Sequence, residues 1–512
     1  MIGLLAQFQP PQAPIPQGPP PLQVPQVDWL AVGPEVALAV AAMILVVVAA
    51  LNRGRRDLSG LYLDLSLAGV AASALATARL WNVVSDTPYQ ALANMVAADG
   101  FSVFLRMIIL AATALGLLVT HGYLRREGIE GPECHALMLL AATGMLLMTS
   151  ANDLIVVFLA LEILSIALYV LAAFDRRRLE SQEAGLKYFV LGSFSSAVFL
   201  YGVALCYGAT GTTSLAGIAA FLAGNTLFSS GLLLAGIAFI LVGLGFKVAA
   251  VPFHMWTPDV YQGAPSPVTG FMAAGAKAAG FAALLRVFGT AFDAYSMDWR
   301  PLAWVLAVGS LVVGSVVAIV QEDVKRMLAY SSIGHAGYVL MAFQSDTGPG
   351  FASALFYLLA YSFMVVGSFA VVTVVGRQGD RRHRLDDYRG LGSRQPLLAG
   401  ALTLFLLAQA GVPLTSGFMA KFSVFSATVD AREYSLVIVG VLAAVVAMFF
   451  YLRLIVLMYM TPPDEEEDAG ARAFDLDPAT GTALALAAVA TVVLGVLPGP
   501  VLDFARDATL LF

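Results

Sequence analysis

Charged residues are scarce in this chain of 512 residues. Asp, Glu, Lys and Arg make up 12% of it, against roughly 25% in soluble domains. Hydrophobic residues account for 59%, and the mean hydropathy is +0.82. Long apolar runs recur from one end to the other, whereas a membrane β-barrel would show short alternating segments. The sequence therefore predicts an all-α polytopic membrane protein.

Cysteine is almost absent. Cys134 and Cys206 are the only two, whereas a typical iron–sulfur cluster or structural zinc site needs four ligands. No GxGxxG follows a strand, and the chain has no P-loop. We therefore expect no cofactor or metal on this chain, and we interpret both cysteines as small apolar residues. Any redox or nucleotide chemistry would belong to another chain.

The first 28 residues form a Pro-rich extension. Residues 1–27 contain eight prolines and no Lys or Arg. The short apolar patch at the start has neither a basic region nor a small-residue cleavage site, which argues against a signal peptide. Pro-rich segments favour an extended, solvated backbone. We expect this extension to be disordered or to lie on the surface.

Fourteen apolar spans follow the extension. Their approximate bounds are 29–51, 59–83, 98–120, 133–150, 152–174, 181–208, 226–251, 262–290, 301–320, 325–342, 350–376, 396–426, 432–459 and 478–505. We divide the chain into the extension (1–28), the first three helices (29–125), helices four to eight (126–295), helices nine to thirteen (296–460), and an acidic loop with the last helix (461–512).

The basic residues indicate an orientation. Eighteen Lys and Arg lie in loops that follow odd-numbered spans, and three lie on the opposite side. Cytoplasmic loops carry such an excess. This predicts a multi-pass protein of a bacterial inner membrane, with both termini on the outer side.

Four ionisable residues fall deep inside spans. Glu162 lies nine residues after Asp153, roughly 14 Å along a helix. Lys277 lies ten residues past Pro267, roughly 15 Å along its helix. Lys247 and Lys421 lie in the seventh and twelfth spans. A charge at the bilayer centre costs several kcal/mol, and such residues mark ion and proton paths.

These four residues predict a proton relay. The bland alternatives are static ion pairs, which three lysines facing one carboxylate would leave unbalanced, and snorkelling, which works only near helix ends. His335 and His254 are possible relay residues, because histidine titrates near neutrality. Either histidine is as easily a packed polar residue.

Other charges have simpler interpretations. Lys325 and Arg326 are expected to anchor a span at the interface, and Arg106 has no explanation from the sequence. The acidic loop at 461–477 is expected to be solvated. Four more residues near span ends are expected to snorkel to the headgroups: Glu35, Arg79, Arg286 and Arg453.

Backbone breaks accompany two of the lysines. Pro413, after Gly411, interrupts the twelfth span, and Pro252 loosens the end of the seventh. Such breaks are tolerated in membranes only where protein or water satisfies the backbone. The two interrupted spans are five apart, so a five-span repeat would be inverted in the membrane, as in many transporters.

Five motifs resemble the antiporter-like membrane subunits of respiratory complex I and their relatives in multisubunit cation/proton antiporters. They are LEILSIALYVL around Glu162, GFKVAAVPFH around Lys247, AGAKAAGF around Lys277, EDVKRMLAYSSIGHAGY around His335, and GVPLTSGFMAKF around Lys421. The stretch HMWTPDVYQGAPSPVTGFMA is most similar to the subunit N branch of that family. The resemblance covers roughly 30–460.

The resemblance implies fourteen helices, two inverted five-helix repeats, and broken helices seven and twelve. It implies a proton-translocating subunit of NADH-quinone oxidoreductase. Glu162 would pair with Lys247, Lys277 would be the central relay, His335 would connect it to Lys421, and Lys421 would serve the outer half-channel.

The resemblance also implies the partners. These are other membrane-arm subunits, which would hold NADH, FMN, iron–sulfur clusters and quinone, together with lipid, protons and water, but no nucleic acid. Two alternatives stay open: a subunit of a multisubunit Na+/H+ antiporter, and a structural spacer that does not conduct.

Overall fold

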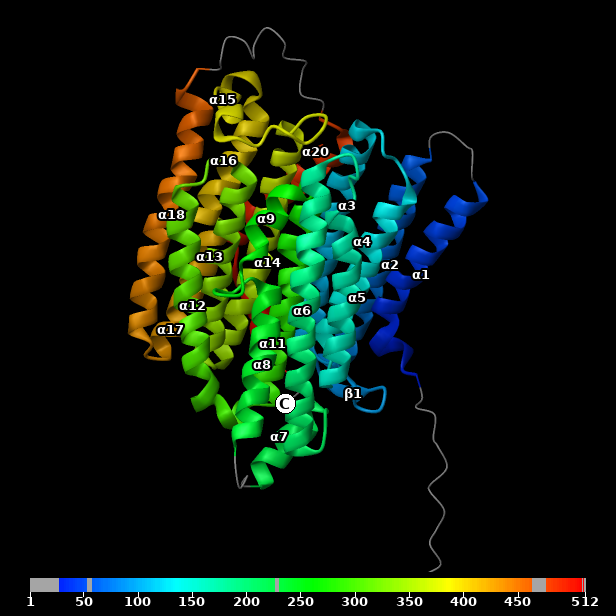
Figure 1. The fold of residues 1–512 in the computed structure, drawn as a ribbon, viewed down its shortest axis with the longest axis vertical. Coiled ribbons are helices and arrows are strands. Elements are labelled where there is room, and N and C mark those ends of the chain that lie inside the picture. Colours follow the sequence, from blue (N-terminus) through cyan, green and yellow to red (C-terminus); the bar gives the residue numbers. More distant parts are fainter. Residues whose placement is uncertain (1–26, 53–57, 226–229, 463–475, 509, 511–512) are drawn as a thin grey trace, which may run out of the picture.

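The protein is a bundle of long, roughly parallel helices, seen here in a computed structural model (Figure 1). The structure describes residues 27–52, 58–225, 230–462, 476–508 and 510. Within these ranges, twelve helices are long and apolar enough to cross a membrane. The predicted all-α membrane fold is confirmed.

The first half of the chain contains one small hairpin among its helices. The hairpin pairs β1 (Tyr89–Ala91) with β2 (Val96–Ala98) in antiparallel register. The helices are α1 (Trp29–Leu51), α2 (Ser59–Val84), α3 (Gly100–Glu127), α4 (Pro132–Ser150), α5 (Leu154–Ala172), α6 (Leu179–Thr210), α7 (Leu215–Gly224), α8 (Gly231–Val248), α9 (Trp256–Gly263), α10 (Ser266–Phe271), the π-helical turn η1 (Met272–Ala276), and α11 (Lys277–Thr290). The sequence predicted neither the hairpin nor α7.

The second half continues the bundle. Its elements are η2 (Asp293–Tyr295), α12 (Ser296–Ile319), α13 (Val324–Ser345), α14 (Gly348–Val375), η3 (Leu385–Tyr388), α15 (Leu391–Arg394), α16 (Pro396–Ala410), α17 (Ser416–Asp430), α18 (Tyr434–Met460), α20 (Pro478–Val496) and α21 (Gly499–Asp507).

Local chemistry fixes where several helices begin and end. Asp99 and Ser102 form a reciprocal capping box at the start of α3, and Asp153 and Asp323 each accept a backbone N–H at the start of α5 and α13. Gly211 ends α6 in the left-handed conformation, with φ of 74°, which glycine adopts without a steric penalty.

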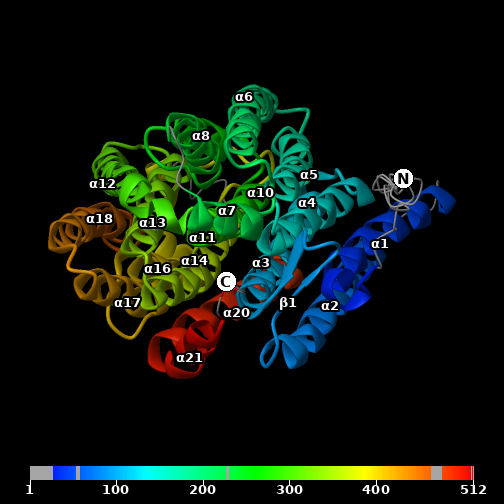
Figure 2. The same cartoon turned by 90° about the horizontal axis from the view of Figure 1, so that it is seen from below.

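The bundle has a buried centre and an exposed rim. The span from Ser266 to Thr290 is entirely buried in its apolar window, and α14 is 89% buried, whereas α1 and α18 are each 28% buried. Seen from below, α11, α14 and α3 lie inside, and α1, α6, α12 and α18 lie outside (Figure 2). A lysine on α11 is therefore shielded by other helices on every side.

Two predicted interruptions coincide with helix ends. α8 ends at Val248 and α9 begins at Trp256, while α16 ends at Ala410 and α17 begins at Ser416. The count of fourteen spans and the inverted repeats, with their boundaries, stay predictions. Most of the Pro-rich extension and of the acidic 461–477 loop lies outside the described residues.

Candidate functional site

Lys247 lies in the last turn of α8 and is 3% exposed. Its ammonium donates to the Ser165 hydroxyl at 2.9 Å and to the Tyr188 hydroxyl at 3.3 Å. Glu162 lies one turn before Ser165 on α5, is partly buried, and has a buried Oε1 without a hydrogen-bond partner. A serine hydroxyl therefore occupies the place at Lys247 that the resemblance gave to the Glu162 carboxylate.

Lys277 lies at the centre of the bundle, directly after the π-helical turn η1, and is 3% exposed. Its ammonium donates to the backbone carbonyl of Ser332 on α13 at 2.5 Å. The Ser332 hydroxyl in turn accepts a hydrogen bond of 2.7 Å from Tyr361 on α14. π-Helical turns occur mostly at functional sites, and this one sets the direction of the buried lysine.

Lys247 and Lys277 are linked by packing. A Cβ added to Gly280 would lie 3.4 Å from the Cγ of Lys247. Gly280 is one helical turn beyond Lys277, so the stem of Lys247 packs on the same side of α11. In the described part of the chain no hydrogen bond joins the two ammonium groups.

Lys421 on α17 reaches the end of the neighbouring helix α16. Its ammonium donates to the backbone carbonyls of Gln409 and Ala410, at 2.9 Å each. The last carbonyls of a helix have no intrahelical partner and carry partial negative charge. The break after Ala410 therefore supplies the acceptors, and Gly411 leaves room, since a Cβ there would lie 3.0 Å from the Cδ of Lys421.

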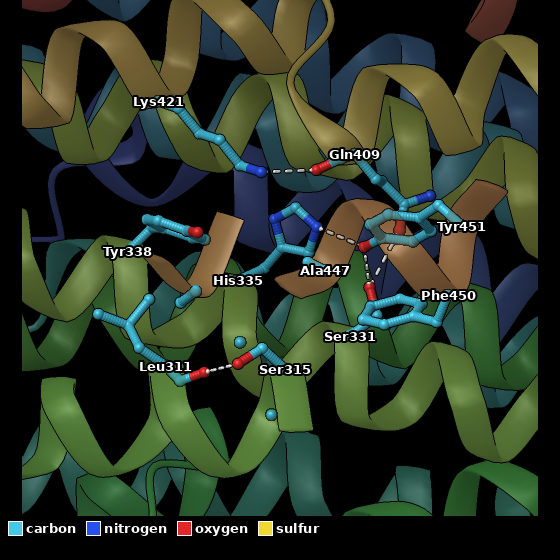
Figure 3. A pocket seen from close by; sticks show the side chains of 13 residues that line it. Leu311, Ser315, Ser331, His335, Tyr338, Gln409, Lys421, Ala447, Phe450 and Tyr451 are labelled. Carbon is cyan, nitrogen blue, oxygen red and sulfur yellow. Dashed lines mark hydrogen bonds between the residues drawn. The ribbon is translucent and has the colours of Figure 1, made fainter. Parts of the chain in front are cut away.

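A small polar cavity joins His335 to Lys421 (Figure 3). His335 contacts the Tyr357 hydroxyl at 2.7 Å and the Tyr451 hydroxyl at 3.2 Å. Ser331 lies 2.5 Å from that Tyr451 hydroxyl and donates to Gln409 Oε1 at 3.3 Å. The cavity volume is about 20 Å³, and one water needs about 10–15 Å³. One water therefore fits among these groups.

The described contacts order most of the predicted residues. Lys277 contacts Ser332, the adjacent Ser331 reaches Gln409, and the carbonyl of Gln409 accepts from Lys421. His335 lies beside this line on α13. His254 is partly buried between α8 and α9, and none of its described hydrogen bonds reaches these residues. The role of His254 stays a prediction.

Three expectations about other charges were wrong. Arg286 is 2% exposed and pairs with Asp99 through both terminal nitrogens, at 2.7 and 2.8 Å. Glu35 is also buried, and its partner at 2.6 Å is Arg106, the residue without an explanation from the sequence. These pairs sit between helices, so neither side chain extends to the headgroups.

Lys325 is buried too, at 0% exposed. It donates to the Ala264 carbonyl at 2.6 Å and lies 3.4 Å from Asp380. It is therefore not an interface anchor. Arg79 and Arg453, in contrast, are exposed.

Sequence reasoning missed Ser331, Ser332, Gln409 and Tyr451. Each is a single polar group in an apolar span, as in LLAQAGV, and a polar residue inside a membrane helix is the pattern that would have found them. Within the described ranges, no three His, Cys, Asp or Glu residues are grouped to hold a metal ion.

Comparison with known proteins places these residues in a family. The model of the NADH:quinone oxidoreductase/Mrp antiporter transmembrane family matches residues 151–447. NADH-quinone oxidoreductase subunit N of Trichlorobacter lovleyi is 44% identical over 93% of this chain and 96% of that protein. This chain belongs to the NADH-quinone oxidoreductase subunit N family.

Solved structures agree with the subunit N assignment. A chain of respiratory complex I from Thermus thermophilus is 34% identical and has a TM-score of 0.77, over 93% of this chain and 100% of that one. A chain of the Mrp complex from Dietzia has a TM-score of 0.82 at 21% identity, which shows a shared fold only. The predicted proton-translocating membrane subunit of NADH-quinone oxidoreductase, part of a multisubunit membrane complex, is confirmed.

Proposed function

We propose that this subunit carries protons along Lys247, Lys277 and Lys421, with the serines, Gln409 and His335 of α13 and α16 between the last two. In this proposal Glu162 biases the charge state of Lys247. A proton released from Lys247 moves to Lys277 and then past Ser332 and Ser331 to Lys421. Lys421 delivers the proton toward the outer side.

One observation carries the proposal: all three buried lysines have neutral partners. Lys247 donates to two hydroxyls, and Lys277 and Lys421 donate to backbone carbonyls. A hydroxyl or a carbonyl tolerates a neutral lysine as well as a charged one, whereas a buried carboxylate would need the charge to stay. These lysines can therefore change charge without leaving a buried anion unbalanced.

Glu162 acts on Lys247 from a short distance in this proposal. Its Oε1 has no partner, and Ser165 lies between it and the lysine on the same helical face. A charged Glu162 favours the charged lysine, and a neutral or displaced Glu162 favours proton release.

The finer features of the setting are also proposals. We place the redox cofactors NADH, FMN, iron–sulfur clusters and quinone on other subunits, and we expect neighbouring membrane-arm subunits as partners. The start of α1 and the C-terminal end lie toward the same end of the bundle (Figure 1). Contacts such as Arg178 with Asp380 and Arg326 with Asp259 join the basic loops at one end, which supports termini on the outer side of a bacterial inner membrane.

Proton pumping by the assembled complex in proteoliposomes tests the path. We expect Lys277→Ala and Lys421→Ala to reduce the protons moved per NADH oxidised, and Glu162→Gln to reduce them less, because Lys247 keeps its hydroxyl partners. Lys187→Ala is the matched control, since this lysine is 41% exposed at the bundle end. Normal pumping in both alanine variants would favour a structural spacer instead.

A further inference from the structure

Asp380 is fully buried, at 0% exposed, in the connection between α14 and η3. Its Oδ2 accepts from Arg178 at 2.9 Å, from the Ser266 backbone N–H at 3.2 Å and from Lys325 at 3.4 Å. Its Oδ1 accepts from the Ser266 hydroxyl at 2.8 Å and contacts His383 Nε2 at 2.9 Å. One carboxylate thus holds four side chains from four segments.

Three of these partners stand at the same ends of three different helices. Arg178 is the residue that caps α6, Ser266 is the first residue of α10, and Lys325 is the second residue of α13. Lys325 also bonds the carbonyl of Ala264, directly before α10. Asp380 therefore fixes α6, α10 and α13 against one another at one end of the bundle.

Each of these three helices carries part of the proton path. Tyr188 follows Arg178 by ten residues on α6, and Lys277 follows Ser266 by eleven on the span of α10, η1 and α11. Ser332 follows Lys325 by seven residues on α13. At 1.5 Å per residue these groups lie roughly 10–16 Å from Asp380, so the carboxylate contacts none of them.

We propose that Asp380 is a positioning residue for proton transfer, which keeps Tyr188 in reach of Lys247 and the Ser332 carbonyl in reach of Lys277. This inference rests on the proposed path. A helix shifted along its axis carries every group on it by the same amount, and misplacement by 1 Å is enough to disrupt a transfer that depends on hydrogen-bond distance.

The charge of Asp380 is held by its surroundings. Burial alone would raise its pKa, but Lys325, His383 and Arg178 outweigh burial and hold the pKa well below its usual range. The carboxylate is therefore ionised at neutral pH. Its replacement by an amide would leave Arg178 and Lys325 without their shared anion, and a buried charge without a partner is costly.

The test measures protons moved per NADH oxidised in proteoliposomes with the assembled complex. We expect Asp380→Asn to lower this ratio by as much as Lys277→Ala does, and the double variant to be no lower than Lys277→Ala alone. Asp380→Glu keeps the charge and is expected to recover part of the ratio. Ser266→Ala removes a single donor and is expected to cause a smaller loss in the same direction.

Asp259→Asn is the matched control. Asp259 also bridges α6 and α13, through Lys187 at 2.8 Å and Arg326 at 2.6 Å, but it is partly exposed and does not contact α10 through these bonds. We expect it to keep the normal ratio.

The outcomes separate this inference from the proposed path. A normal ratio in Lys277→Ala would overturn the path itself. A low ratio in Lys277→Ala with a normal ratio in Asp380→Asn would overturn the positioning role alone. A double variant worse than Lys277→Ala would also overturn it, because the two residues would then act independently. If Asp380→Asn does not assemble, Ser266→Ala and Asp380→Glu decide by the same measure.

Discussion

Buried cations in this protein fall into two groups with different partners. Arg106 and Arg286, in the helices around α3, each face a buried carboxylate at 2.6–2.8 Å. Lys247, Lys277 and Lys421, in α8, α11 and α17, bond hydroxyls and carbonyls. Both groups are buried to a similar extent, so burial alone does not separate them.

The partner decides what a buried cation can do. A guanidinium that faces a carboxylate keeps its charge and ties two helices together, because loss of either charge leaves the other uncompensated. An amine that faces a neutral acceptor can gain or lose a proton at lower cost. The first arrangement suits a scaffold, and the second suits transfer. The predictions below break or sharpen this contrast.

The largest effect is expected from Arg286→Met. This change leaves Asp99 buried without its guanidinium, which costs about 3–5 kcal/mol. We expect the amount of assembled complex and its midpoint of thermal unfolding to fall sharply. The double variant with Asp99→Asn should recover much of both. An unchanged midpoint in Arg286→Met would mean that the pair does not hold α3 and α11 together.

Lys277→Met should give the opposite result. Removal of a buried ammonium that faces no carboxylate removes a desolvation cost, so the unfolding midpoint is expected to stay level or rise. Pumping per NADH oxidised is expected to fall in the same sample. A midpoint as low as that of Arg286→Met would show that this lysine belongs to the scaffold group.

Gly411→Ala tests the acceptor end of α16. This glycine has φ of 92°, where a side chain is strained by about 1–2 kcal/mol, and its added Cβ would press on Lys421. We expect moderate destabilisation and reduced pumping. The control is Gly400→Ala in the same helix, where a Cβ meets nothing within 4 Å. Equal pumping in the two variants would contradict the role of this turn.

The smallest effect is expected at Asp259, which lies outside the spans. Burial would raise its pKa, but hydrogen bonds from Lys187 and Arg326 outweigh burial and lower it. Its contribution to stability is thus present above about pH 4 and is lost as the pH falls through the lowered pKa. Partly exposed pairs contribute about 0.2–1 kcal/mol. Asp259→Asn should flatten the acid side of a plot of unfolding midpoint against pH by that amount.

The sequence was sufficient for the membrane fold and for the burial of the main site residues. Lys277 could be placed at depth because a span of known rise carries it far from either end, and the break near Lys421 follows from Gly411 and Pro413. The family and its function were also predictable, because the motifs around Glu162, Lys247 and Lys277 are long and specific.

The partners of these residues were not predictable from spacing. Ser165 takes the position at Lys247 expected for Glu162, and this depends on how α5 is rotated against α8. Arg106 and Glu35 are 71 residues apart, and periodicity carries no information on which distant helices meet. For the same reason Arg286 was expected at the headgroups, although it lies against Asp99.

The π-helical turn before Lys277 has a consequence for insertions and deletions. Such a turn holds its carbonyl bonds one residue wider than the helix on either side. Removal of one residue from Met272–Ala276 would restore an ordinary ladder and rotate everything after it by about 100° relative to what precedes it. The ammonium of Lys277 would then point away from α13. The length of this short stretch of small residues is thus as constrained as the identity of the lysine itself.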